Sequence, residues 1–188
     1  MENEAMGGDM GNGREQEAGY EMSSDMPLSL GVDSAAGLRA FEALGKFMED
    51  DGWHPQKLED NHVYRAYFVG HNGEVTCFAQ IRADLEQFIF YVVMPVRAPA
   101  HMRPAVAEYI TRANYGLRIG NFEMDFDDGE VRYKSSIDFE SLELTPGLIR
   151  NTIYPAVQTM DRYLPGVLSV VFGGKSAEEA IAEIEDQE

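Results

Sequence analysis

Hydrophobic side chains first recur at helical spacing within residues 35–51, where they fall three or four positions apart. The stripe consists of Leu38, Phe41, Leu44, Phe47 and Met48. Ser34 precedes this run, and its hydroxyl is suited to accept a hydrogen bond from a free backbone N–H of the first turn. Gly52 follows as a helix stop. The pattern predicts an amphipathic helix that buries the stripe against a core.

Alternating polar and apolar positions then predict two strands, at 62–69 and 74–82, joined by the sequence GHNG. Asn72 and Gly73 both tolerate positive φ, so we expect them to form a two-residue hairpin turn. One face of this hairpin is largely apolar, because the turn places Phe68 opposite Cys77, Ala66 opposite Ala79 and Tyr64 opposite Ile81. The other face is mixed and carries Arg65, Tyr67, Thr76, Phe78, Gln80 and Arg82.

A third strand, QFIFYVVM at 87–94, is apolar on both of its faces. Because helices cover one face of a two-layer domain, the second apolar face predicts a surface for a protein partner or for a second copy of the chain. The residues expected on that surface are Tyr67, Phe78, Ile89, Tyr91 and Val93. The competing interpretation is that a loop or the C-terminal helix covers this face, and the sequence favours neither.

Two further helices follow. The first is expected at 104–115, ends with Gly116 as a left-handed cap, and turns Val106, Ala107, Ile110 and Ala113 inward. The second begins with Thr145 as N-cap and Pro146 at the first helical position. We expect Pro155 to kink this long helix and Pro165 to interrupt it.

The stretch NFEMDFDDGEVRY, at 121–133, holds five carboxylates and suggests a calcium site. An EF-hand loop starting at Asp125 fails, because Gly129 and Glu130 fall where a ligand and the glycine are needed. A hairpin about Asp128 and Gly129 gives every residue a partner instead. Its pairs are Phe126 with Val131, Met124 with Tyr133, Asp125 with Arg132, and Glu123 with Lys134. We therefore predict a hairpin and no metal site.

The predicted order is α-β-β-β-α-β-β-α, which indicates an α+β fold: two layers, with an antiparallel five-stranded sheet and helices on one face. Residues 34–174 form this domain. Residues 1–33 have few apolar positions and no hydrophobic period, so we expect a disordered acidic tail. Residues 175–188 form an acidic extension, in which Ser176 and Glu179 have capping-box spacing and predict a marginal helix.

The charge balance bears on partners and location. The chain has 33 acidic and 15 basic residues, with eight acids in 1–33 and six in 175–188. Such an acidic chain is not expected to bind nucleic acid or an anionic membrane surface. Its apolar runs are too short to span a bilayer, no signal peptide opens it, and its one cysteine cannot form an internal disulfide. We therefore expect a cytoplasmic protein.

Catalytic, metal and cofactor motifs are not found in the sequence. The histidines, at 54, 62, 71 and 101, lack ligand spacing, and we expect them to be exposed loop residues. Cys77 lies on the apolar face of its strand and is expected to be a buried core residue. No glycine-rich phosphate loop opens a helix. We therefore predict no catalytic residue, no metal and no cofactor.

A group of basic residues lies between Pro95 and Asn121, where Glu108 is the one acid. Its members are Arg97, Arg103, Arg112 and Arg118, with His101 beside them. An ordinary solvated helix face is one interpretation. The other is a basic patch that receives an acidic segment, including the chain's own tails.

The run RANYGLRIGNFEMDFDDGEVRYKSSIDFE, followed by a long helix and DRYLPGVLSVVFGG, resembles the YbjN-domain family of bacterial proteins. The resemblance covers roughly residues 35–173. It is most specific at Asn114, Gly120, Phe122, the Asp128–Gly129 turn and the segment from Asp161 to Pro165. It implies a fold similar to that of type III secretion chaperones and a role as a sensory transduction regulator. It supplies no catalytic residue.

Two functions follow as hypotheses. The first is a non-enzymatic protein-binding domain, chaperone-like or regulatory, that engages an unidentified protein or forms a homodimer through its sheet face and terminal helix. The alternative is a small-molecule sensor or an unrecognised enzyme with a pocket between sheet and helices. Converging polar groups with shifted pKa values would favour the alternative.

Overall fold

A computed structural model of the protein describes residues 31–58 and 62–186. These residues form four helices and six strands. The helices are α1 (Ala35–Asp50), α2 (Arg103–Gly116), α3 (Pro146–Val171) and α4 (Ala177–Glu185). The strands are β1 (Gln56–Lys57), β2 (Val63–Val69), β3 (Glu74–Arg82), β4 (Gln87–Val93), β5 (Asn121–Met124) and β6 (Val131–Asp138). Most of the predicted tail, 1–33, lies outside the described residues.

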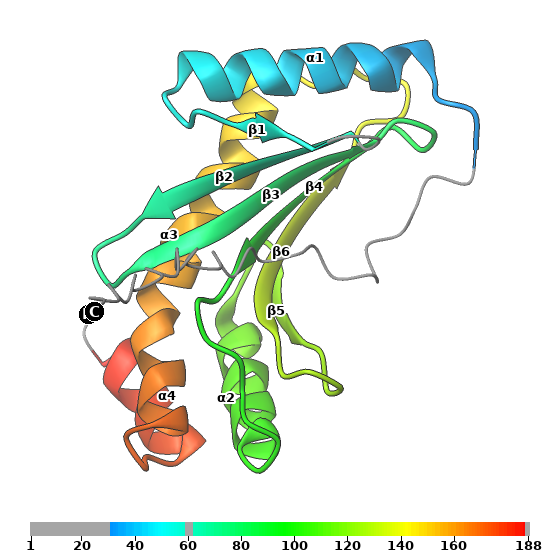
Figure 1. Ribbon diagram of the computed structural model, residues 1–188. Helices are drawn as coiled ribbons and strands as arrows, with labels where there is room; N and C mark the ends of the chain where they lie inside the picture. Colours follow the sequence, from blue (N-terminus) through cyan, green and yellow to red (C-terminus); the bar gives the residue numbers. More distant parts are fainter. Residues whose placement is uncertain (1–30, 59–61, 187–188) are drawn as a thin grey trace, which may run out of the picture.

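The predicted α+β class is confirmed, with one sheet in the order β1-β2-β3-β4-β6-β5 and every pairing antiparallel. The helices gather on one side of it: α3 runs along the back, α1 crosses one end, and α2 and α4 lie at the other end (Figure 1). The sheet has six strands and not the five predicted. The sequence missed β1 because a two-residue strand is too short to show a period.

One large core joins the helices to the inner face of the sheet. Its fully buried side chains come from every layer and include Leu44, Phe88, Phe90, Tyr133, Ile153 and Met160. The predicted face assignments of β2, β3 and β4 are confirmed, because Ala66, Cys77, Ala79 and Val92 all belong to this core.

The β2–β3 hairpin has a different register from the predicted one. Ala66 pairs with Cys77, not with Ala79, and the backbone N–H of Gly70 donates to the carbonyl of Gly73 at 2.8 Å. The turn is therefore centred on residues 71–72 and not on 72–73. A slip of two residues leaves each side chain on its predicted face, because the side-chain period of a strand is two.

The β5–β6 hairpin is also shifted by two residues. Glu123 pairs with Arg132, and the Asp125 N–H donates to the Glu130 carbonyl at 2.9 Å. The predicted pairs of Asp125 with Arg132 and of Phe126 with Val131 are therefore wrong. Residues 126–129 form a four-residue loop that Gly129 completes with φ +80°. Its position is fixed from outside the hairpin, because the Ala98 N–H donates to the Gly129 carbonyl at 2.7 Å.

The caps predicted for α1 and α3 are confirmed: Ser34 and Thr145 accept hydrogen bonds from Gly37 and Leu148. Leu38 was assigned to the buried stripe of α1, but its side chain is 42% exposed. Gly37 is buried in its place, because the helix approaches the backbone of Ala83 so closely that a Cβ would clash.

The predicted glycine cap of α2 is wrong. Gly116 is the last residue of that helix, and Gly120 in the following loop has the left-handed φ, +72°. Among the residues expected to face inward, Ala107 is only partly buried. Tyr109 is completely buried instead, and its hydroxyl donates to the Tyr163 carbonyl at 2.9 Å.

The predicted interruption of α3 at Pro165 is also wrong, since the helix is continuous from Pro146 to Val171. A proline leaves the carbonyl four residues earlier without its helical donor. That carbonyl belongs to Asp161, and the side-chain amide of Asn72 donates to it at 2.9 Å. A turn distant in sequence thus supplies the missing hydrogen bond.

The C-terminal extension belongs to the core. The capping box of Ser176 and Glu179 is confirmed, and Ala177, Ala180 and Ile181 of α4 are buried against α2 and α3. The predicted marginal helix is therefore a packed element. Across the described ranges, no helix combines the length and hydropathy that crossing a membrane would require.

Candidate binding surface

The sheet has a second face, turned away from the core, which we call the outer face. Register places all five residues of the predicted interaction surface on it, because Phe78 pairs with Tyr91 and Tyr67 lies in line with Thr76 and Val93. The five residues are Tyr67, Phe78, Ile89, Tyr91 and Val93. The five residues therefore share one face of the sheet, and their role as a binding surface stays a prediction.

Their exposure differs from the predicted open patch. Tyr67 is 54% exposed, but Phe78, Ile89, Tyr91 and Val93 are between 3% and 9% exposed. These four form an apolar cluster with Val63, which is completely buried, and Leu58 packs against it. We call this the outer cluster. Among the described residues, no side chain of a helix belongs to it.

Two polar atoms beside the outer cluster are buried and have no hydrogen-bond partner among the described residues. They are the Oε1 of Gln80, which pairs with Val63 and Ile89 in the sheet, and the Nε of Arg65, which is opposite Phe78. One is an acceptor and the other a donor. Leaving such groups unpaired costs about 1–3 kcal/mol each, so the outer face can offer both to a bound segment.

A network of charges borders the outer cluster on the side of β5 and β6. Glu123 accepts hydrogen bonds from Arg132 and from Lys134, each at 2.6 Å. The Arg132 guanidinium also lies over the ring of Tyr91, 4.5 Å from its centre. Burial raises the pKa of Glu123, but the bonds from Lys134 and Arg132 outweigh it and hold that pKa below its usual value.

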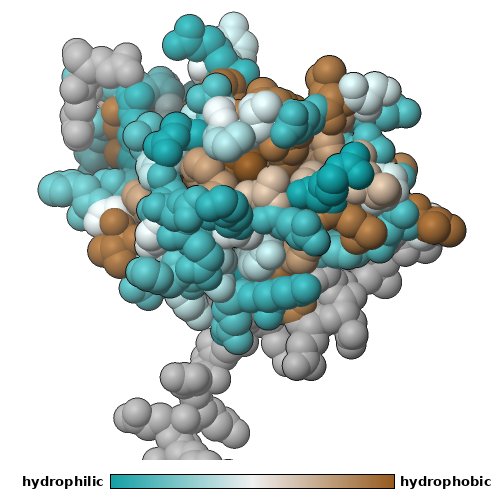
Figure 2. Space-filling model, turned by 90° about the horizontal axis from the view of Figure 1, so that it is seen from above, coloured by the Kyte–Doolittle hydropathy of each residue, from teal (hydrophilic) through white to brown (hydrophobic). Residues whose placement is uncertain are grey.

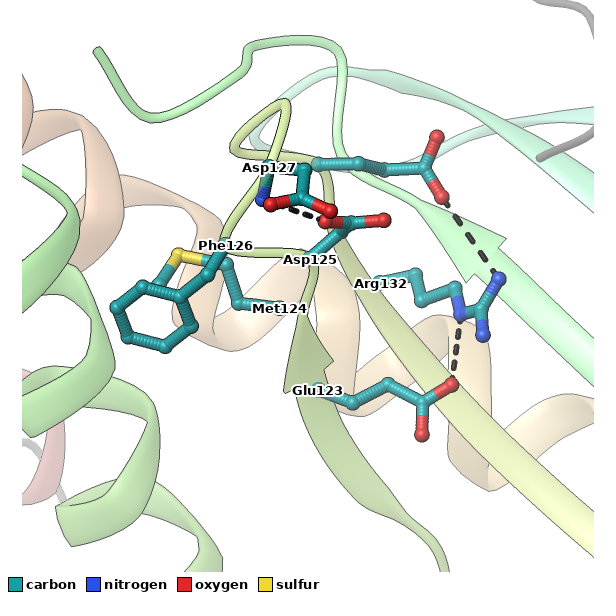
Figure 3. A pocket seen from close by; sticks show the side chains of 7 residues that line it. Glu123, Met124, Asp125, Phe126, Asp127 and Arg132 are labelled. Carbon is teal, nitrogen blue, oxygen red and sulfur yellow. Dashed lines mark hydrogen bonds and ion pairs between the residues drawn. The ribbon is translucent and has the colours of Figure 1, made fainter. Parts of the chain in front are cut away.

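A hollow of about 350 Å³ opens beside this network (Figure 3). It is lined by Glu123, Met124, Asp125, Phe126, Asp127, Glu130 and Arg132. Arg132 reaches toward Glu123 on one side, while Met124 and Phe126 point to the other. Burial and the charges of Asp128 and Asp125 raise the pKa of Glu130, although Arg132 and Arg97 oppose the shift.

The remaining acidic residues of the hairpin serve the loop. Asp125 accepts from the N–H of Asp127 at 2.7 Å, and Asp128 accepts from the N–H of Glu130 at 2.8 Å and from Arg97. Within the described ranges, no three His, Cys, Asp or Glu side chains are grouped so that they could hold a metal ion. Four of the five carboxylates that suggested calcium, those of Glu123, Asp125, Asp128 and Glu130, are engaged by backbone N–H groups or by basic side chains.

The predicted basic patch is divided among local contacts. Arg97 pairs with Asp128 and Glu130, and Arg103 donates to the Phe126 carbonyl at 2.7 Å. Arg112 pairs with Glu108 one turn earlier in α2. Arg118 lies in the exposed loop after α2. Arg97 and Arg103 thus hold the β5–β6 loop, and the role of the four arginines as a patch for an acidic segment stays a prediction.

Cys77 and the four histidines were the candidates for chemistry in the sequence, and their positions in the fold are as follows. Cys77 is completely buried, and burial raises the pKa of its thiol. His54, His71 and His101 are exposed, as predicted. His62 is half-buried, stacks edge-on against Phe41 and lies 3.6 Å from Asp33.

Sequence reasoning missed a second hollow, of about 540 Å³, between α1 and the segment that joins β6 to α3. Its lining is Ala36, Arg39, Ala40, Ala43, Glu86, Phe139, Ser141, Leu142, Glu143 and Leu144. Figure 2, which looks onto the end of the molecule that carries α1, shows hydrophobic surface near the middle and hydrophilic surface around it. Glu86 and Ser141 have positive φ, +52° and +64°, a strained conformation that sequence does not reveal.

The fold and the outer face define an α+β domain whose sheet has one face covered by helices and one that combines apolar and charged side chains. The YbjN family, described as "Putative bacterial sensory transduction regulator", matches residues 40–169. The chain belongs to this family, as the sequence predicted. The family description names a regulatory role and no enzymatic reaction.

No curated protein matches the sequence. Two solved structures are similar. A chain from the "Crystal Structure of the ExsC-ExsE Complex" is 14% identical, with 69% of this chain and 93% of that chain covered and a TM-score of 0.45. A chain described as "YbjN, a putative transcription regulator from E. coli" is 12% identical, with 71% and 89% covered and a TM-score of 0.45.

The residues that carry the family resemblance hold the fold together. The side-chain amide of Asn114 bonds to both backbone groups of Phe122, accepting at 2.7 Å and donating at 3.0 Å. Asp161 accepts from the backbone N–H groups of His71 and Asn72. They identify the family through its architecture and lie apart from the outer cluster.

Proposed function

We propose that this chain is a protein-binding regulatory domain without catalytic activity, and that its outer face binds a segment of another protein. The outer cluster carries the proposal. It is a group of large apolar side chains on the sheet face that the described helices leave free. A core surrounded by charged residues is the usual composition of an interface.

Two further observations support this function. Arg132 links the outer cluster to the charged rim, because it contacts both the Tyr91 ring and Glu123. The unpaired atoms of Gln80 and Arg65 give a bound chain a donor and an acceptor to satisfy. The family description, a transduction regulator, agrees with binding to another protein.

Affinity capture from the native cytosol tests the proposal. Tyr67→Glu adds a charge to an exposed position of the outer face, so we expect it to reduce recovery of a specific partner by tenfold or more. Leu142→Glu is the matched control, because Leu142 is 67% exposed and lies on the β6–α3 segment. The purified partner should then show the same order of affinities. Equal recovery by the two variants contradicts the assignment to the outer face.

The hollow beside Glu130 favours a second function, a sensor for a small cation. Two of its carboxylates, those of Glu123 and Glu130, have shifted pKa values, which is the observation expected of such a site, although it lies on the β5–β6 hairpin and not between sheet and helices. Calorimetric titration with L-arginine tests it. Saturable binding that Glu130→Gln abolishes would favour the sensor, and a flat titration would leave the protein-binding function.

A further inference from the structure

The burial of the outer cluster requires a cover that the described residues do not supply. Val93 ends β4 and is 4% exposed, and Tyr91 is 3% exposed. Arg132 shields part of the Tyr91 ring, but no helix of the described chain lies over this face. Outward side chains in the middle of an uncovered sheet keep a solvent-facing side. The cover therefore comes from another part of the chain or from a second molecule.

The lengths of the three segments outside the described residues decide which of them can cover the outer cluster. The described residues on either side of 59–61 lie beside the start of β2, where the Leu58 N–H donates to the Val63 carbonyl at 3.0 Å. Three residues span about 10 Å when extended, and Val93 lies four residues along β4 from Ile89, the neighbour of Gln80, so about 13 Å further on. Residues 187–188 are two residues long and follow α4, which packs against α2 and α3. Residues 1–30 are the remaining segment, and they are long enough.

The first described residue, Gly31, lies near the end of β3, from which the preceding residues can reach the outer face. Gly31 lies beside Asp84, where an added Cβ would be 3.1 Å from the Asp84 Cβ. Asp84 bonds to Arg82, the outer-face residue at the end of β3. From there to Val93 is six residues of β4, about 20 Å. Eleven extended residues span about 36 Å, so residues 20–30 cover this distance.

The sequence of residues 20–30, YEMSSDMPLSL, alternates in a way that suits a sheet face. Apolar side chains occupy every even position except that of Ser24, and polar side chains or proline occupy the odd positions. The apolar members are Tyr20, Met22, Met26, Leu28 and Leu30. An extended segment with this pattern presents one apolar side, because its side-chain period is two. This short period was not recognised among the acidic and glycine residues that precede it.

The polar groups of the outer face match such a segment. An extended backbone offers N–H donors to the Gln80 Oε1 and carbonyl acceptors to the Arg65 Nε, which are both buried and lack partners within the described ranges. We infer that residues 20–30 lie extended across the outer face and cover the outer cluster.

This inference deepens the proposed function in one respect, since a partner that uses the outer face must displace residues 20–30. The inference rests on the proposed function only in its claim that a partner and residues 20–30 compete for the outer face. The contact within the chain is independent of any partner, and it is tested with the purified full chain alone.

Thiol accessibility in the full chain tests the contact. Cys77 is completely buried, so a Val93→Cys variant has one thiol that can report on the outer face. Its reaction with Ellman's reagent should accelerate at least tenfold when the apolar side of the segment is removed by Met26→Ser, Leu28→Ser and Leu30→Ser. The matched control changes the other side, by Ser23→Ala, Pro27→Ser and Ser29→Ala, and should leave the rate unchanged. Continued protection of Cys77 shows that each variant is folded.

Two results would overturn the inference. The first is an equal rate for the Val93 thiol with the intact segment and with the substituted apolar side. The second is protection that rises with protein concentration, which would mean that a second copy of the chain supplies the cover. If the thiol assay shows the expected protection but affinity capture recovers no partner that depends on the outer face, only the proposed function is contradicted.

Discussion

At the scale of single residues, Glu123 and Glu130 show how one hairpin gives two carboxylates opposite electrostatics. Glu123 is partly buried and Glu130 is buried, and burial by itself raises the pKa of each. Glu123 accepts two short hydrogen bonds from basic side chains, which reverse the shift. Glu130 has its basic neighbours at 3.7 Å and 3.8 Å and two aspartates close by, so its pKa stays raised.

The two glutamates should therefore affect stability with opposite sign. The folded pKa of Glu123 is lowered, so its contribution is present at neutral pH and is lost as pH falls below the unfolded value. Glu123→Gln should destabilise the protein by about 1 kcal/mol at pH 7. The folded pKa of Glu130 is raised, so its charge costs stability as pH rises, and Glu130→Gln should stabilise at pH 7.

Urea denaturation at pH 7 and at pH 3.5 measures both effects. Each difference from the wild type should shrink at the lower pH, because both glutamates are then largely protonated in the unfolded chain. Two variants that shift stability in the same direction at pH 7 would contradict the assignment.

A comparison of substitutions at Gly52 and Gly129 distinguishes the cost of a left-handed backbone from the cost of a steric clash. Both have φ +80°, but a Cβ on Gly129 would meet the Ala98 carbonyl, whereas nothing lies within 4 Å at Gly52. Gly52→Ala should cost about 1–2 kcal/mol, the cost of the left-handed conformation. Gly129→Ala should cost clearly more, because it also breaks the Ala98–Gly129 hydrogen bond. Thermal unfolding of both variants measures the difference, and equal midpoints would show that the loop moves freely from Ala98.

At the scale of elements, contacts between distant segments decide where the hairpins turn. The alternation in β2, β3 and β4 predicted the correct faces, but both hairpins are shifted by two residues from their predicted registers. A shift of two preserves every face, so the hydrophobic pattern cannot distinguish the registers. Asp161 and Ala98 make that choice, through hydrogen bonds to turn residues about 90 and 30 positions away.

Asp161→Ala should therefore loosen the β2–β3 turn. The carboxylate accepts the N–H groups of His71 and Asn72, at 3.0 Å and 2.8 Å, and the turn is exposed, so we expect a loss of about 1 kcal/mol. Hydrogen exchange should accelerate at these two amides and remain unchanged within α1. Glu74→Ala is the control, because Glu74 is an exposed acid of the same hairpin. Unchanged exchange at His71 and Asn72 would contradict the role of Asp161.

At the scale of the whole molecule, the C-terminal helix shows what pattern alone underestimates. Its few apolar positions predicted a marginal helix, yet α4 completes the core at the end of the sheet where α2 and α3 meet. A short helix gains stability mostly from packing its apolar side. Sequence periodicity does not show whether a packing site exists for it.

A pair of substitutions in α4 tests this packing. Ala180 is 1% exposed and Ala182 is exposed, two positions apart in one helix. Ala180→Asp buries a charge and should lower the free energy of unfolding by at least about 3 kcal/mol, whereas Ala182→Asp should cost less than about 1 kcal/mol. Denaturation followed by circular dichroism measures both. Similar small losses for the two variants would mean that α4 is not part of the cooperative unit.

The sequence by itself determined the family, the order of the main elements, the caps of α1 and α3, and the residues that share each face of the sheet. These features depend on local propensity and on hydrophobic periods of two residues in strands and 3.6 in helices, which can be read from the sequence without knowledge of the fold. It also grouped the five residues of the outer face, but it did not determine their burial. The tertiary structure decided the hairpin registers, the continuity of α3 through Pro165, the docking of α4 and the contacts by which Arg97 and Arg103 hold the β5–β6 loop. Each of these depends on a contact between segments far apart in the chain, and no local pattern records such a contact.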